Sequence, residues 1–406
     1  MSRHRALPAL AALSLLLAAL LAGPAPAAAP PPRDVIDPAT AQRLDEAVRD
    51  AMAEGDIPGV TVGLWKDDGW AYERSFGTSD TATGAPMNAD LHTRIGSVTK
   101  TFTVTAVLRL VDQGAVALDA PIGRYVAGVP GGDRITVRQL ADMRSGLHSY
   151  TEDPAFLAAY QKDPHGSWTP RQLLDIAFKH PADFPPGARW EYSNTNTVLL
   201  GVLVEKVTGR TLAAYLQDEV LRPAGLADTV LPAGATIPSP YAHGYTDLGG
   251  GGKPTDASGW NPSWAWAAGA MTSTLDDLHT WAGVLARGKL PDGTLLLSPG
   301  TQIDRLVMLP TGYPGVGYGL GLADVNGWLG HNGELPGYET IAARLPQEDA
   351  VLVVIVNSDI DGDHGNLATL VGKAVTQVAT PAHVWSLPSA AQPNGTPSPA
   401  QPSPSR

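Results

Sequence analysis

Residues 94–100 of the chain read RIGSVTK, and this stretch joins a predicted strand end to a predicted helix. It places Ser97 three residues before Lys100. On a helix, side chains three residues apart lie on one face with Cβ atoms about 5–6 Å apart, so the lysine amine can take the serine proton. At a helix start, free N–H groups and the helix dipole also favour developing negative charge. Ser97 is therefore a candidate nucleophile, and Lys100 is a candidate base.

The alternative is that Ser97 only caps the helix. Serine is a common N-cap residue, and Ser-x-x-Lys arises by chance in many chains. Two observations favour the catalytic interpretation. Lys100 is the only lysine with a serine three residues before it, and the pair falls at a predicted strand-to-helix junction.

The sequence on both sides of this stretch predicts an α+β fold. Before it, β-branched and aromatic runs at 60–65 and 70–76 flank the turn-forming Asp-Asp-Gly of a hairpin. After it, apolar residues recur at helical spacing until the strand patterns return near the C-terminus. The predicted helices cover residues 38–54, 96–114, 136–143, 169–179, 195–207, 211–221, 274–286 and 366–378, and further strands cover 318–323, 338–345 and 351–357.

Strands near both ends with a helical block between them predict one antiparallel sheet flanked by helices, beside a mostly helical lobe. We expect a single large domain with two lobes over residues 34–380. Residues 34–95 and 255–380 would form its α/β part, and residues 96–254 would form the lobe.

The first residues have the features of an export signal. Arg3 and Arg5 precede an apolar stretch over 10–22, and Ala-Pro-Ala at 25–27 offers a cleavage site. The apolar stretch is shorter than the roughly 20 residues of a spanning helix, although an uncleaved anchor is the alternative. We therefore predict a signal peptide at residues 1–29 and a mature protein in the cell envelope or outside the cell, with no stable membrane insertion.

The composition narrows the classes of partner. Apolar residues form 43% of the 406 residues, which is enough for a large core. The net charge is −12, and without a basic stripe a nucleic-acid partner is not expected. Cysteine is absent, which excludes disulfides and thiolate metal sites.

Residues 381–406 are rich in Pro and Ser and are predicted to be a disordered tail. We expect a monomer.

A second candidate group is Tyr192-Ser193-Asn194, on a predicted loop before a helix. A phenol there can relay protons if nearby cations lower its pKa. Asn194 can bind a substrate amide or orient Lys100. The alternative is a packing tyrosine, with Asn194 or Thr195 as the helix cap.

The third candidate group is His331-Asn332-Gly333-Glu334, after a possible strand at 327–330. A glycine on a strand edge lets the backbone approach a ligand closely. An imidazole can tune a neighbouring tyrosine. Taken alone, His331 is as easily explained as a structural histidine.

The three groups occur in the order Ser-x-x-Lys, Tyr-x-Asn and His-x-Gly. This arrangement resembles the penicillin-recognising serine hydrolases, which include D-alanyl-D-alanine carboxypeptidases, class C β-lactamases and related esterases. The likeness covers roughly residues 40–380 and is greatest to secreted carboxypeptidases that carry His in the third motif. Further segments that match the family are ITVRQL at 135–140, SGL at 145–147, HGY at 243–245 and GYGLG at 317–321.

The resemblance implies a mechanism without a metal or an organic cofactor. Ser97 would attack a carbonyl and form an acyl-enzyme, while Lys100 and Tyr192 share the proton transfers. The backbone N–H groups of Ser97 and Glu334 would hold the oxyanion. His331 would polarise Tyr192 and assist protonation of the leaving group.

The chain departs from the family pattern where a substrate carboxylate is expected to bind. Asn332 and Glu334 stand where the related carboxypeptidases have threonines, and Ala323 and Asp324 stand where they have basic residues. A missing cation and an added anion both weaken recognition of a free carboxylate. Alternatively, Glu334 points to solvent and Asn332 supplies an N–H.

Asn194, Asn332 and Gly333 are thus the candidate substrate-binding residues, and the substrate is a small peptide, β-lactam or ester. The leading hypothesis is a D-alanyl-D-alanine carboxypeptidase-like enzyme. An esterase or a D-amino-acid amidase or aminopeptidase is the alternative. A non-catalytic penicillin-binding protein is disfavoured, because Ser97, Lys100, Tyr192 and His331 are all present.

Overall fold

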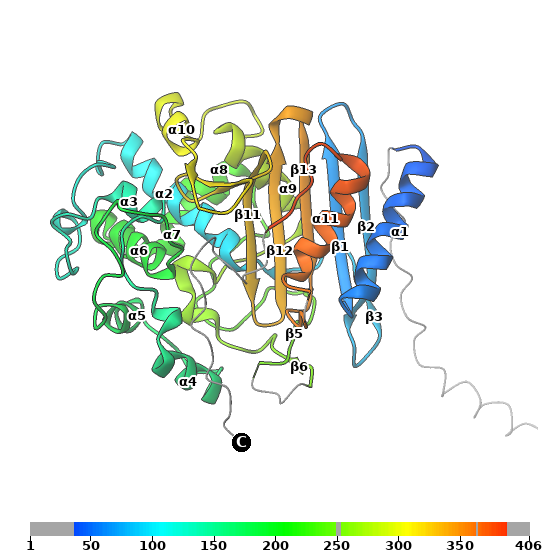
Figure 1. Ribbon diagram of the computed structural model, residues 1–406, viewed down its shortest axis with the longest axis horizontal. Coiled ribbons are helices and arrows are strands. Elements are labelled where there is room, and N and C mark those ends of the chain that lie inside the picture. The colour runs from blue at the N-terminus through cyan, green and yellow to red at the C-terminus, as the bar shows by residue number, and fades with distance from the viewer. Residues whose placement is uncertain (1–35, 249–252, 363, 388–406) are drawn as a thin grey trace, which may run out of the picture.

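The protein is represented by a computed structural model that describes residues 36–248, 253–362 and 364–387. Its nine-stranded antiparallel sheet has the order β3-β2-β1-β13-β12-β11-β10-β9-β8 (Figure 1). Strands from both ends of the chain share this sheet, and a helical block lies beside it. The predicted α+β class is confirmed.

The sheet strands are β1 Gly59–Lys66, β2 Ala71–Asp80, β3 Ala85–Pro86, β8 Leu309–Pro310, β9 Val316–Tyr318, β10 Ala323–Val325, β11 Trp328–Leu335, β12 Tyr338–Leu345 and β13 Ala350–Val356. Two short ladders pair β4 Thr93–Arg94 with β7 Thr272–Ser273, and β5 Tyr245–Thr246 with β6 Thr255–Asp256. The α-helices are α1 Pro38–Glu54, α2 Thr99–Asp112, α3 Val137–Ala141, α4 Pro154–Lys162, α5 Pro170–Ala177, α6 Asn194–Thr208, α7 Leu212–Leu216, α8 Arg222–Ala224, α9 Leu275–Arg287, α10 Pro299–Arg305 and α11 Leu367–Ala379.

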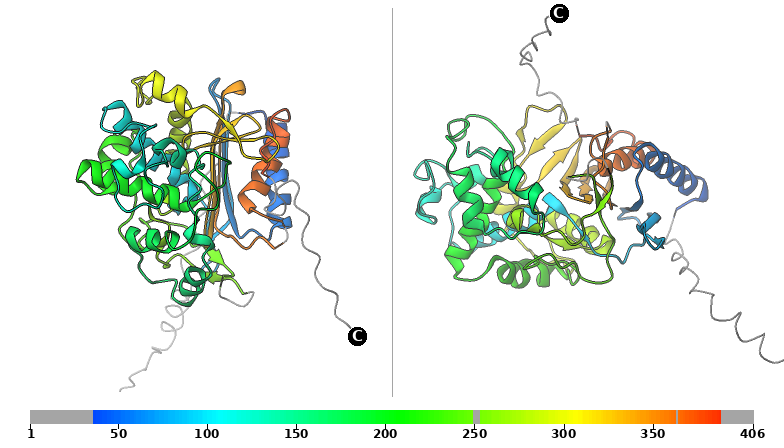
Figure 2. Two further views of the ribbon diagram at one scale, coloured as in Figure 1. Left: turned by 60° about the vertical axis from the view of Figure 1, so that its left-hand side comes forward. Right: turned by 90° about the horizontal axis from the view of Figure 1, so that it is seen from below.

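The centre of the sheet is covered on both faces. α1 and α11 pack on one face, and α9 and the helical lobe lie on the other (Figure 2). Every residue of β12 and β13 is consequently buried, which explains why β13 is a continuous apolar run. Leu44, Val48 and Val371 belong to the apolar core between the two helices and the sheet.

The predicted helix ends near the sheet are real capping sites. Asp37 caps α1 by accepting a hydrogen bond from the Thr40 N–H at 2.9 Å. Asn366 caps α11 in the same way through the Thr369 N–H, also at 2.9 Å. These local bonds satisfy N–H groups that the helices leave free, so the sequence sets the boundaries.

α2 runs through the lobe and is buried along almost its whole length. Its polar residues Thr101, Thr103 and Thr105 are buried as well, and each hydroxyl donates to a backbone carbonyl. Because each hydroxyl has a hydrogen-bond partner, burying these threonines costs little free energy. α2 is therefore a rigid support for the residues at its N-terminal end.

Two predicted elements differ from the structure near β10. The strand expected over residues 318–323 is two short strands joined by a turn, in which Gly321 has φ of +72°. The Gly-Leu-Gly sequence forms that turn because glycine adopts positive φ at little cost. The strand expected over residues 327–330 continues to Leu335, so it includes the third motif.

The predicted disordered tail begins at residue 381, but the structure is ordered beyond this residue. Trp385 is fully buried, and its backbone N–H donates to Thr376 Oγ1 at 2.9 Å. The Trp328 Nε1 donates to the carbonyl of His383 at 2.7 Å. Residues 381–387 thus complete the core beneath α11. The prediction of disorder relied on the proline and serine content of the tail and did not include these contacts.

The predicted signal peptide at residues 1–29 and the tail from residue 388 lie outside the described residues. Within the described ranges, no helix combines the length and apolar character needed to cross a membrane.

Candidate active site

Ser97 lies in a 3₁₀ turn, Gly96–Val98, that leads into α2. Gly96 has φ of +50°, a conformation that favours glycine. The N-cap position of α2 is Val98, and the Ser97 side chain makes no capping bond. The capping alternative for Ser97 is therefore wrong.

The Ser97 hydroxyl is the common partner of two other side chains. Lys100 Nζ lies 2.9 Å from Ser97 Oγ, and the Tyr192 hydroxyl lies 2.8 Å from the same atom. Lys100 Nζ also donates to the carbonyl oxygen of Ala268 at 2.7 Å. Lys100 Nζ is 4.8 Å from the centre of the Tyr192 ring. The structure thus brings the first and second motifs, which are 95 residues apart, into one hydrogen-bonded group.

The surroundings separate the protonation states of these two groups. Lys100 is fully buried, and burial lowers its pKa well below the usual lysine value. Burial raises the pKa of the Tyr192 phenol, and the charge of Glu334 adds to this. The lowered tyrosine pKa that a proton relay was expected to need is not found, because burial raises the pKa more than the Ser97 hydrogen bond lowers it. A neutral amine can accept the serine proton, and a neutral phenol can donate one.

β11 packs directly against the turn that carries Ser97. A Cβ on Gly96 would lie 2.3 Å from the backbone N of Glu334, and one on Gly333 would lie 2.0 Å from the carbonyl oxygen of Ile95. Real side chains cannot occupy such positions, so both residues must be glycine. The same hypothetical Gly333 Cβ is 3.0 Å from the Ser97 N, which places the Ser97 N–H at the edge of β11.

The register of the β11–β12 hairpin directs the Glu334 N–H toward this turn. Leu335 pairs with Tyr338 around a two-residue turn, and Glu334 pairs with Glu339. In a two-residue hairpin the closing pair is hydrogen-bonded and the next pair is not. The Glu334 N–H therefore points away from β12, and with the Ser97 N–H it can hold an oxyanion.

His331 has other partners than those expected. Its Nε2 lies 3.1 Å from the Tyr318 hydroxyl, and its Nδ1 bonds the carbonyl oxygen of Asn332. Its ring is 6.2 Å from that of Tyr192, centre to centre. Burial lowers the pKa of His331 to about 4, so the ring is neutral, with Nδ1–H donating and Nε2 accepting. In this arrangement His331 cannot supply a positive charge to Tyr192.

Tyr318 is the site residue that sequence reasoning missed. It stands in the GYGLG segment at 317–321, 13 residues before His331, and no spacing rule connects the two. The short strands β9, β10 and β11 bring them together.

Asn194 contacts the loop before α4, not the lysine. Its Nδ2 donates to Thr151 Oγ1 at 3.1 Å, and its backbone N–H donates to Ser149 Oγ at 3.2 Å. The suggestion that Asn194 orients Lys100 therefore fails, and the helix cap is Ser193, one residue earlier than expected. Asn194 is half-buried, so its amide remains a candidate substrate contact.

The side chains of Asn332 and Glu334 lie on the opposite face of β11 from His331, because side chains alternate along a strand. Glu334 is exposed, as one alternative proposed, while its cross-strand neighbour Glu339 is buried. Glu339 accepts a hydrogen bond from the Ala368 N–H at 2.8 Å, and burial with the Glu334 charge raises its pKa to about 9. The surrounding protein and the charge of Asp361 also raise the pKa of Glu334. This edge of the site is acidic.

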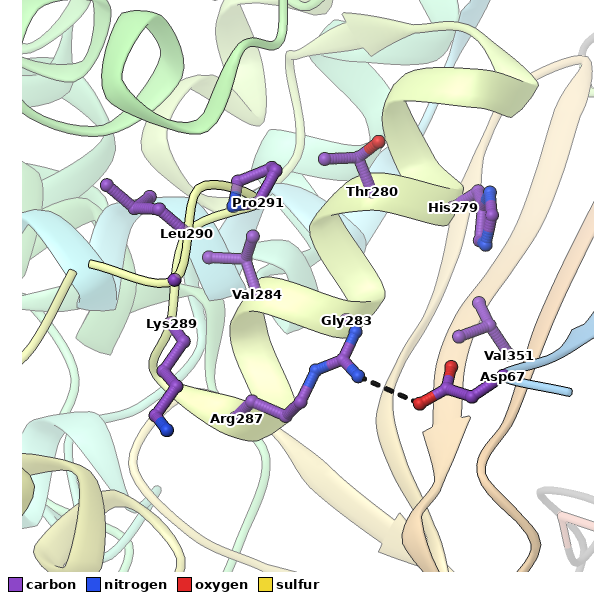
Figure 3. Close-up of a pocket in the computed structure, with 11 residues that line it drawn as sticks. Asp67, His279, Thr280, Gly283, Val284, Arg287, Lys289, Leu290, Pro291 and Val351 are labelled. Atoms are coloured by element: carbon purple, nitrogen blue, oxygen red, sulfur yellow. Dashed lines mark hydrogen bonds and ion pairs between the residues drawn. The ribbon is translucent and has the colours of Figure 1, made fainter. Parts of the chain in front are cut away.

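A separate pocket of about 430 Å³ lies beside α9 and contains none of these residues (Figure 3). Arg287 points across it and donates to Asp67 at 3.1 Å. The rest of the wall is mixed, with Val284 and Leu290 beside the polar His279, Thr280 and Lys289. Nothing in it resembles an acyl-transfer site.

Comparison with known proteins agrees with this geometry. A family model described as Beta-lactamase matches residues 44–376. The crystal structure of a D-stereospecific amidohydrolase from Streptomyces sp. has 33% identity and a TM-score of 0.74, and the match covers 85% of this chain and 99% of that chain. The D-amino acid amidase from Ochrobactrum anthropi SV3, complexed with L-phenylalanine amide, has 27% identity, a TM-score of 0.74 and the same coverage.

Esterase EstB of Burkholderia gladioli is 32% identical over 201 residues. That match covers 46% of this chain and 50% of the esterase.

Fold and site together define a serine hydrolase of the β-lactamase and penicillin-binding superfamily. The chain belongs to the β-lactamase family.

Proposed function

We propose that the chain cleaves amide bonds through an acyl-enzyme on Ser97. The observation that carries this proposal is the hydrogen-bonded group of Ser97, Lys100 and Tyr192, in which burial lowers the pKa of the lysine. A lowered lysine pKa favours the neutral amine, and a neutral amine beside a serine hydroxyl can activate that nucleophile.

Acylation follows from these contacts. Ser97 Oγ forms a bond to the substrate carbonyl carbon while Lys100 Nζ accepts the hydroxyl proton. The N–H groups of Ser97 and Glu334 donate to the oxyanion that develops. When the carbon–nitrogen bond breaks, the Tyr192 hydroxyl protonates the leaving amine and recovers its proton from Lys100. Water then attacks the acyl-enzyme with the same groups acting in reverse, which releases the acid.

The substrate that the chemistry of the site favours is an amide of a D-amino acid. Two relatives that align over 99% of their own chains are a D-stereospecific amidohydrolase and a D-amino acid amidase. The exposed carboxylate of Glu334 disfavours a substrate that carries a free carboxylate at this edge, whereas Glu339, with its pKa raised to about 9, carries no charge at neutral pH. Both observations support the amidase or aminopeptidase alternative.

A D-alanyl-D-alanine carboxypeptidase activity on cell-wall peptides is the second candidate. The backbone of Gly333 in the third motif packs against the turn that carries Ser97, as the resemblance to these carboxypeptidases implies. An esterase activity would use the same acyl-enzyme, and EstB supports it over part of the chain.

A substrate panel tests these proposals. The panel contains D- and L-phenylalanine amides, a peptide ending in D-Ala-D-Ala, a penicillin and a short acyl ester, with Ser97→Ala as the control for background hydrolysis. We expect the D-amide to have the highest kcat/KM and the L-amide to be poor. If the D-Ala-D-Ala peptide is the best substrate, the carboxypeptidase proposal replaces the amidase proposal.

We also propose that the enzyme is exported and acts outside the cytoplasm. The proposal rests on the positive start, apolar stretch and small-residue site within residues 1–29. N-terminal sequencing of exported protein should give a start near Ala28. An intact Met1 in the membrane fraction would show an uncleaved anchor instead.

A further inference from the structure

The turn between β11 and β12, formed by Pro336 and Gly337, directly follows the strand that carries the Glu334 N–H. Proline fixes a negative φ at the first turn position, and Gly337 has φ of +87° at the second, so the turn is of type II. Type II turns fit the twist of a two-residue hairpin poorly, and they leave the second N–H out of the bond that closes the turn. A partner outside the hairpin can therefore stabilise it.

Asp359 is that partner. Its Oδ1 accepts a hydrogen bond from the Gly337 N–H at 3.1 Å, and its Oδ2 accepts one from the Thr246 hydroxyl at 3.2 Å. Its own backbone N–H donates to the carbonyl oxygen of Tyr245 on β5 at 3.2 Å. A Cβ on Gly337 would lie 2.6 Å from the carbonyl carbon of Gly244, so the turn packs tightly on the chain just before β5. One carboxylate thus ties the turn to β5.

The charge of this carboxylate is unfavourable for the fold. Within the described ranges, no lysine, arginine or histidine forms an ion pair with Asp359. Burial and the charge of Glu334 raise its pKa to about 6, although the bonds from Gly337 and Thr246 lower it. In the unfolded chain a carboxyl group ionises at about pH 4, so above pH 6 the ionised form destabilises the folded state relative to the unfolded state. Ionisation of Asp359 therefore lowers stability at neutral pH.

We propose that Asp359 is a positioning residue, which holds the β11–β12 turn so that the Glu334 N–H stays beside Ser97 in the oxyanion hole. The inference rests on the proposed acyl-enzyme function. On the side of the nucleophile, the strand is fixed by Gly96, whose Cβ would lie 2.3 Å from the Glu334 N. Asp359 fixes it at the turn. Donors held in this way stabilise the transition state because they do not reorganise during the reaction.

Asp361 provides a matched control in the same loop. It is exposed, and its charge also acts on Glu334. None of the described residues donates a hydrogen bond to its carboxylate. Asp361→Ala therefore removes a charge from this loop and leaves the tie to the turn intact.

The first test measures kcat, KM and the affinity for an aryl boronic acid, which forms a tetrahedral adduct with a catalytic serine. Loss of a whole oxyanion-hole donor costs about 10²–10³-fold in kcat, and a displaced donor costs less. Asp359→Ala should therefore lower kcat on the best substrate of the panel roughly tenfold and weaken boronic acid binding by a similar factor, with KM changed less than about twofold.

Two further variants accompany this measurement. Asp359→Asn keeps an oxygen acceptor for the Gly337 N–H and should recover most of the loss, and Asp361→Ala should behave as the wild type. Wild-type kcat and boronic acid affinity in Asp359→Ala, or an equal loss in Asp361→Ala, would overturn the proposal.

The second test separates positioning from a purely structural role and does not depend on the folding of Asp359→Ala. Thermal unfolding at about pH 7.5 should give the same or a higher midpoint for Asp359→Asn, because this variant cannot ionise. Thr246→Val keeps the shape of the buried threonine but removes the second bond, and it should lower kcat several-fold. A lower midpoint in Asp359→Asn, or an unchanged kcat in Thr246→Val, would mean that the tie serves the fold alone. Hydrolysis by Ser97→Ala at the wild-type rate would instead refute the proposed function.

Discussion

The two faces of the central sheet bury different kinds of residue. On the face beneath α1 and α11, the core is almost wholly apolar, and Glu339 is a buried carboxyl group that interrupts it. On the face toward the lobe, Lys100 and His331 are buried among polar partners. The first face supplies stability at little electrostatic cost. The second holds Lys100 and His331, whose pKa values burial lowers, which favours their neutral forms.

This difference implies that substitutions on the two faces have separable effects. Changes beneath α11 should lower stability and leave chemistry intact. Changes at Ser97, Lys100 or Tyr192 should lower activity by orders of magnitude, and their cost in stability is limited to the one or two hydrogen bonds that each side chain makes.

The largest effect is expected for Lys100→Met. Without the amine, the serine proton has no acceptor, and kcat/KM should fall by roughly 10²–10⁴-fold. In the wild-type enzyme, activity should fall as pH drops through the lowered pKa of Lys100, because the protonated amine cannot accept a proton. Steady-state rates across pH check both points, with the exposed Lys206→Met as the control.

Tyr192→Phe should follow, with a loss of about 10²–10⁴-fold in kcat, because its hydroxyl contacts Ser97 directly. His331→Ala should lose far less, roughly tenfold or below, because both ring nitrogens bond groups outside the proton path. Parallel kinetics on the two variants decide the matter. A near-normal kcat in Tyr192→Phe would remove the phenol from the mechanism.

On the apolar face, Trp385→Ala should reduce the free energy of unfolding by about 3–5 kcal/mol, as large-to-small core changes do. The Trp385 side chain is fully buried. The kcat of Trp385→Ala should match that of the wild-type enzyme at temperatures where the variant is folded. Denaturant unfolding and kinetics on the same preparation provide the measurement, and a drop in kcat with unchanged stability would contradict the separation of the two faces.

The smallest effect concerns the edge where the faces meet. Glu334→Thr, best combined with Asn332→Thr, should shift the preference from amides toward free acids by up to about tenfold, since about 1.4 kcal/mol is a factor of ten. The measurement is the ratio of kcat/KM for matched D-amide and free-acid peptides at low salt. Glu46→Gln on α1 is the control. An unchanged ratio would mean that the Glu334 carboxylate does not reach the substrate.

The apolar face could be predicted closely from the sequence because its signals are local. The patterns behind the helices predicted at 38–54 and 366–378, the 67–69 turn and the β13 run each depend on residues that are close in sequence. The burial of Trp385 was not predicted for two reasons. Its segment contacts β11, which is distant in sequence, and the prolines around it are typical of a disordered tail.

The catalytic group could be predicted in part. Ser97 and Lys100 are linked by helical spacing, which is local. Only resemblance connected them with Tyr192, because that contact spans 95 residues. The direction of the Tyr192 pKa shift depends on burial, and the Tyr318–His331 contact depends on sheet register. No local sequence pattern predicts either.

The most direct test of the account is the identity of the acylated residue. The full chain is treated with a fluorophosphonate or a penicillin, digested and analysed by mass spectrometry, with Ser97→Ala in parallel. We predict a single adduct on the peptide that contains Ser97, absent from Ser97→Ala and slowed in Lys100→Met. An adduct on any other serine, or equal labelling of Ser97→Ala, would contradict it.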